Sequence, residues 1–222
     1  MNANTKAGGW ALLVGAIAYV GLMAVHPSQP GGPQIGALSL NAVVHGTALV
    51  GQPVLLYGFW QLTRMMGDRA LAQLALCFYV LAAGAVIIAA TLSGIVMPLI
   101  MEAGRTRGAS MPGPAPSDME VLRQALQSQA IYTMWLNRSF AGVHVGLSSL
   151  AILLWSIAWP SRAALALFTR GIGVLAGLGV IAWALSGSMT LEAQHGALLV
   201  TLVQMGWAVL AALALMSART AK

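Results

Sequence analysis

Hydrophobic residues in this chain form long, nearly unbroken runs separated by short polar segments. Six runs are long enough to cross the hydrocarbon core of a bilayer, which takes roughly 20 apolar residues in a helix. They cover residues 8–25, 38–62, 71–101, 139–159, 164–186 and 193–217. An α-helix satisfies its own backbone hydrogen bonds, so such runs predict helices in lipid. The pattern predicts an all-α polytopic membrane bundle of six transmembrane helices.

The six runs take up most of the 222 residues, so residues 1–222 are predicted to form a single domain. The longest connection, at about 102–138, contains a Pro/Gly-rich stretch at 111–116 and is expected to be an outer loop. Its second half, residues 119–136, alternates apolar and polar residues with helical spacing. This spacing predicts an amphipathic segment at the outer surface that continues into the fourth span.

Composition and charge support a membrane protein. Only 7% of the residues are charged, against roughly 25% in soluble domains, which excludes a water-soluble globule. The net charge of +6 does not indicate nucleic-acid binding, because the basic residues flank the apolar runs and form no patch. With the N-terminus inside, seven of the eleven Lys and Arg residues lie on the inner side, which predicts cytoplasmic N- and C-termini.

Small residues and tryptophans indicate how the helices pack. Gly171, Gly173, Gly177 and Gly179 in the fifth run allow close backbone contact, either within the bundle or in an oligomer. Pro53 is expected to kink the second helix, and a transport hypothesis places a polar cavity there. Four tryptophans near the ends of runs predict an interfacial belt: Trp10, Trp60, Trp155 and Trp159.

Ionisable groups inside a membrane are rare and are candidates for a functional site. In the predicted topology, all four histidines fall in the outer third of the bilayer or at its outer surface. His45 and His144, on different helices at similar depth, form a candidate axial pair for haem b. The spacing of histidines does not match the familiar membrane b-type cytochromes.

A divalent metal is the other candidate cofactor. Glu192 lies one helical turn before His195, so the two side chains can face the same side of a helix. Glu102 and His26 lie at a similar depth, and imidazole with carboxylate suits zinc, iron or copper. The predicted metal ligands are therefore His195, Glu192, His26 and Glu102.

Two alternatives stay open for these polar residues. A histidine in a membrane helix can simply hydrogen-bond a neighbouring Ser, Thr or Asn, such as Asn41 or Ser148. Arg138 and Asn137, at the start of the fourth span, are candidate substrate-binding residues. Arg138 can instead be an interfacial arginine whose charged head reaches water.

Two stretches carry a family resemblance, and the second opens with the Arg-Gly-x-Gly start of a glycine-rich helix. They are Trp135-Leu136-Asn137 through Trp155, and Leu167 through Gly187. Both resemble uncharacterised six-helix bacterial inner-membrane proteins of a domain-of-unknown-function family. The resemblance implies a multi-pass protein of the plasma (inner) membrane, and it assigns no activity and no site residue.

The leading functional hypothesis is a small binding or transport protein for a small-molecule ligand. The alternative is a haem- or metal-containing membrane redox protein or enzyme with a histidine site near the outer face. A structural or assembly subunit is the third candidate. No Gly-x-Ser-x-Gly elbow or phosphate-binding loop is present, and both aspartates, Asp68 and Asp118, lie in connections, so the sequence favours no enzyme class.

Overall fold

The computed structural model describes residues 3–27, 34–35, 38–110, 116–160, 163–189 and 196–217. Their regular structure is helical apart from a two-residue antiparallel pair, β1 (Gln34–Ile35) with β2 (Leu38–Ser39). A π-helical turn, η1 (Leu92–Val96), joins two of the α-helices. The α-helices are α1 (Ala3–Ala24), α2 (Leu40–Met65), α3 (Ala70–Thr91), α4 (Met97–Ser110), α5 (Pro116–Ala158), α6 (Ala164–Leu185) and α7 (Leu198–Ser217).

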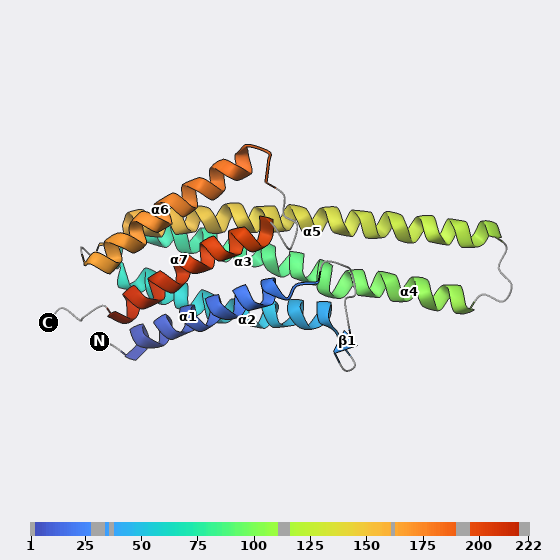
Figure 1. The fold of residues 1–222 in the computed structure, drawn as a ribbon, viewed down its shortest axis with the longest axis horizontal. Helices are drawn as coiled ribbons and strands as arrows, with labels where there is room; N and C mark the ends of the chain where they lie inside the picture. Colours follow the sequence, from blue (N-terminus) through green and yellow to red (C-terminus); the bar gives the residue numbers. More distant parts are fainter. Residues whose placement is uncertain are drawn as a thin grey trace.

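Six helical segments are long and apolar enough to cross a membrane, which confirms the predicted number and class of helices. In five of them a single helix forms the span, and in the sixth α3, η1 and α4 follow one another without a break. The helices lie along one long axis, with the start of α1 and the end of α7 at the same end of the bundle (Figure 1).

The connection at 102–138 differs from the sequence prediction. Most of it is helical, because α4 continues to Ser110 and α5 already begins at Pro116. Between residues 117 and 141 no glycine or proline interrupts α5, so the helix runs unbroken into the span, as predicted. Together α4 and the first part of α5 extend beyond the other helices (Figure 1). The Pro/Gly-rich residues 111–115 lie outside the described residues.

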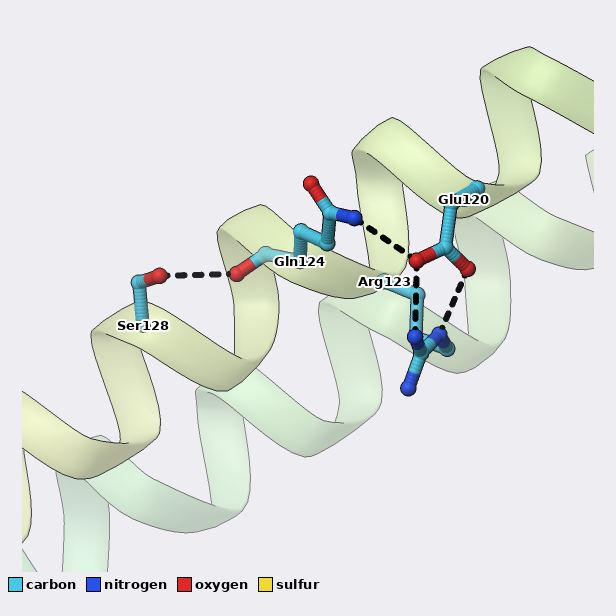
Figure 2. Close-up of polar contacts among 4 residues, drawn as sticks. All are labelled: Glu120, Arg123, Gln124 and Ser128. Atoms are coloured by element: carbon cyan, nitrogen blue, oxygen red, sulfur yellow. Dashed lines mark hydrogen bonds and ion pairs between the residues drawn. The ribbon is translucent and has the colours of Figure 1, made fainter.

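The extended part of α5 carries polar groups suited to water. Figure 2 shows Arg123 donating to both carboxylate oxygens of Glu120, at 2.8 and 2.7 Å, and Gln124 donating to the same carboxylate at 2.7 Å. One turn further on, the hydroxyl of Ser128 donates to the Gln124 carbonyl at 2.9 Å. These side chains are exposed, as expected for the polar face of an amphipathic helix.

The core of the bundle contains a cluster of aromatic rings. Trp155 lies nearly parallel to Phe59, with ring centroids 4.8 Å apart, and the ring of Trp207 lies 6.1 Å from Trp155 and 6.3 Å from Phe59. The indole N–H of Trp155 donates to Oγ1 of Thr63 at 2.9 Å, so its one polar atom is satisfied inside the bundle.

The predicted tryptophan belt is therefore wrong in part. Trp155 and Trp159 are buried, whereas Trp10 and Trp60 are exposed as the prediction requires. A position near the end of a helix does not decide whether a side chain faces lipid or the neighbouring helices, and here the buried pair faces other helices.

Two of the four glycines in α6 permit close packing, as predicted. A Cβ on Gly173 would overlap the side chains of Ser156 and Trp207, and a Cβ on Gly177 would overlap α5. Gly171 and Gly179 instead border open space. Gly171 and Gly179 are free to contact another copy of the chain, and the oligomer stays a prediction.

A candidate binding cavity with three histidines

A cavity of about 170 Å³ lies between α1, α2, α3, η1, α5 and α7. It is found where α1 ends and α2 begins, away from the end of the bundle at which α1 starts and α7 ends (Figure 1). Pro53 does not line it, so the cavity is not where the transport hypothesis placed it. An engineered cavity of about 150 Å³ can hold benzene, so the volume suits an ion or a molecule of few heavy atoms. The polar lining residues are Tyr19, His26, His45, Ser93, Asn137, His144, Thr201 and Gln204.

His26 and His45 face each other in this cavity. Their Nε2 atoms lie 3.2 Å apart, their ring centroids are 4.8 Å apart, and the ring planes cross at 74°. Each ring also makes a contact through Nδ1. Nδ1 of His26 lies 3.0 Å from the carbonyl oxygen of Pro27, and Nδ1 of His45 lies 2.8 Å from that of Asn41.

The π-helical turn η1 holds His45 in place. A Cβ on Gly94 would come within 3.0 Å of Cβ and Cγ of His45, so only glycine allows η1 to approach this close. The side-chain amide of Asn41 donates to the Ser93 carbonyl at 2.7 Å and ties the start of α2 to the same turn. Isolated π-helical turns occur frequently at functional sites.

His144 reaches the cavity from α5. Its Nδ1 lies 3.0 Å from the carbonyl oxygen of Ala82 in α3. A carbonyl oxygen can only accept, so Nδ1 carries the hydrogen in all three histidines. A neutral ring then has an unprotonated Nε2, which can accept a hydrogen bond or bind a cation.

The cavity is mainly apolar, and its polar groups carry no formal charge. Among the described residues that line it, none is Asp, Glu, Lys or Arg. Burial lowers the pKa of His26 from its ordinary value of 6.5, and the hydrogen bond to Pro27 offsets part of this effect. Burial therefore favours the neutral form of His26.

The structure brings together four of the predicted site residues. His26, His45, His144 and Asn137 line the cavity. The rings of the three histidines contact backbone carbonyls, and those of His26 and His45 also contact each other. The packing alternative expected contacts with Ser, Thr and Asn side chains instead.

The other predicted site residues lie elsewhere or outside the described residues. Arg138 is exposed beside Asn137, and Glu102 is exposed and pairs with Arg105. Glu192 and His195 fall outside the described residues. The part of the chain that the structure describes holds no group of three His, Cys, Asp or Glu side chains around a common point. The four-residue metal site therefore stays a prediction.

Haem also stays a prediction. Nε2 of His45 lies against His26, so axial ligation of a haem at this nitrogen would require His26 to move away. A macrocycle would in addition need more room than about 170 Å³.

Sequence reasoning missed several residues of the cavity wall. Gln204 of α7 donates to the hydroxyls of Ser148 and Ser149 at 2.9 and 2.8 Å, and so fixes α7 against α5. A glutamine inside an apolar run was a detectable signal for this contact. Ser93 and Gly94 carried no such signal, because nothing in their neighbourhood predicts a π-helical turn.

Comparisons with known proteins give no match: no family model fits the chain, and neither a curated protein nor a solved structure is similar to it.

Proposed function

We propose that the protein is a small multi-pass membrane protein that binds a small molecule or ion in the histidine-lined cavity. One observation carries the proposal: three histidines, each with Nδ1 on a backbone carbonyl, line a single cavity between the helices. Ionisable groups inside a membrane bundle are costly and rare, so their gathering at one cavity supports a functional site.

The proposed topology places the cavity on the outer side of the plasma (inner) membrane of a bacterium. Both chain termini then lie in the cytoplasm, which agrees with the distribution of Lys and Arg. The exposed ion pair of Glu120 and Arg123 lies beyond the outer face, where water solvates it.

A second candidate is the metal-containing membrane protein of the alternative hypothesis. The facing Nε2 atoms of His26 and His45 favour it over haem. A binding protein and a transporter would both use this cavity. The first test therefore asks whether the cavity can be reached from the outer side, which both functions require.

Cysteine accessibility tests the proposal. In a Cys77→Ser background, we expect Ser93→Cys to react with a small, charged methanethiosulfonate reagent added outside intact cells, because Ser93 lines the cavity. The control is Ile88→Cys, which is exposed on the outside of α3 and would face lipid. Modification at Ser93 should be at least about tenfold faster, since thiols react as thiolates and lipid suppresses ionisation. Equal rates at the two positions would contradict the proposed cavity.

A further inference from the structure

The ring contacts of His26 and His45 require one more hydrogen than two neutral imidazoles possess. Each Nδ1 needs a hydrogen to donate to the carbonyl of Pro27 or Asn41. Both Nε2 atoms then present lone pairs to each other at 3.2 Å. This arrangement is favourable only when a positive centre lies next to both nitrogens.

The ring geometry fits a centre that lies beside the line joining the two nitrogens. A collinear N–H···N bond would separate the ring centroids by about 5.5 Å, the N–N distance plus a ring radius at each end. The centroids are only 4.8 Å apart, so the two rings depart from the collinear arrangement of a direct N–H···N bond. Two nitrogen ligands on one tetrahedral cation, each at about 2.0–2.1 Å, lie about 3.3 Å apart. The Nε2 atoms match this spacing at 3.2 Å.

We propose that Nε2 of His26 and Nε2 of His45 are two ligands of a three- or four-coordinate transition-metal cation. This inference rests on the proposed binding function and names the class of its ligand. The carbonyls of Pro27 and Asn41 complete the arrangement, since a metal-bound histidine almost always donates its other ring N–H to a carbonyl, carboxylate or water.

Charge and ligand type favour Cu⁺ over Zn²⁺. The described lining of the cavity has no carboxylate, so a divalent cation would remain poorly compensated inside the bundle. Cu⁺ has a single charge and accepts thioether as well as imidazole ligands. Met23 lines the same cavity, and the backbone N–H of His26 donates to its carbonyl at 3.3 Å, which places the two residues on one turn. We expect Met23 to supply the sulfur ligand.

Metal binding to the purified protein tests the inference. The protein is isolated in mild detergent with a histidine-free affinity tag, stripped with a chelator, and dialysed against Cu⁺ under a reductant or against Zn²⁺. Metal is then counted per chain by elemental analysis. We expect one Cu⁺ per chain, with a loss of affinity of at least roughly 100-fold in His26→Ala and in His45→Ala.

Matched variants separate the ligands from the cavity wall. Met23→Leu should weaken Cu⁺ binding and leave Zn²⁺ binding unchanged, because a thioether is a soft ligand. Val86→Ala, at an apolar wall position with no atom that can bind a metal, should leave both unchanged. His26 is only half-buried and follows the end of α1, so we expect His26→Ala to fold normally. This variant can therefore test the metal site even if His45→Ala disturbs folding. Thermal unfolding of each metal-free variant serves as the folding control.

The inference would be overturned if the wild type bound no stoichiometric metal, or if His26→Ala bound Cu⁺ as tightly as the wild type. A proton shared between the two Nε2 atoms would then explain their contact. If Ser93→Cys still reacts as expected, the binding cavity stands and only the metal inference fails. If Ser93→Cys is also inert, both fail. Tighter binding of Zn²⁺ than of Cu⁺ at the same two histidines would support the site and overturn the choice of ion.

Discussion

Trp155→Ala is expected to lower the free energy of unfolding by about 3 kcal/mol, the lower end of the range for deleting a buried aromatic side chain. Trp155 is fully buried and packs against both Phe59 and Trp207. Its removal leaves a cavity and ends the hydrogen bond to Thr63. The lower end applies because lipid is apolar too, so the effect comes from lost packing more than from transfer out of water.

Thermal unfolding in mild detergent, followed by circular dichroism, measures this effect. A loss of about 3 kcal/mol corresponds to a fall of roughly 6–12 °C in the unfolding midpoint for a chain of this size. The control is Trp135→Ala on the same helix, where the side chain is 61% exposed and a change within about 0.5 kcal/mol is expected. Equal shifts for the two variants would contradict the aromatic core.

Gly94→Ala is expected to cost about 1–3 kcal/mol of stability and to displace His45. The added Cβ would overlap Cβ and Cγ of His45, which cannot swing away as the tip of a long side chain can, so α2 and η1 must separate. The unfolding midpoint of the metal-free protein should fall by several degrees, and Cu⁺ binding should weaken although both histidines remain.

The control for this variant is Gly84→Ala in α3, where a Cβ meets nothing within 4 Å. Alanine is a better helix former than glycine by about 1 kcal/mol, so this variant should be as stable as the wild type or slightly more stable. If Gly94→Ala unfolds at the same temperature as Gly84→Ala and binds metal as tightly as the wild type, the close contact between η1 and His45 is wrong.

The sequence predicted the helices well because a long apolar helix is recognised from its length and composition. The apolar runs are long, and each gave a helix in the expected place. The predicted end of the third helix, at residue 101, was wrong. Hydropathy falls at Glu102, but the residues that follow still form a helix, and α4 continues to Ser110. An end of an apolar run marks where the environment changes, and the helix can continue into that new environment.

Part of the lining of the cavity could be anticipated from the sequence, and its geometry could not. Rarity in an apolar sequence was enough to single out His26, His45 and His144, and all three line the cavity. Their pairing could not be predicted, because His45 meets His26 across the end of α1 and is held by the π-helical turn at Gly94. Pairing of this kind depends on three segments that meet only in the folded chain.

Nitrogen-15 NMR of histidine-labelled protein at about pH 7.5 tests the central claim most directly, namely that the cavity histidines carry their hydrogen on Nδ1. Signals are assigned with the His26→Ala, His45→Ala and His144→Ala variants. The structure predicts a protonated Nδ1 and an unprotonated Nε2 for His45 and His144, because each Nδ1 meets a backbone carbonyl. A protonated Nε2 with a bare Nδ1 on both residues would contradict the account.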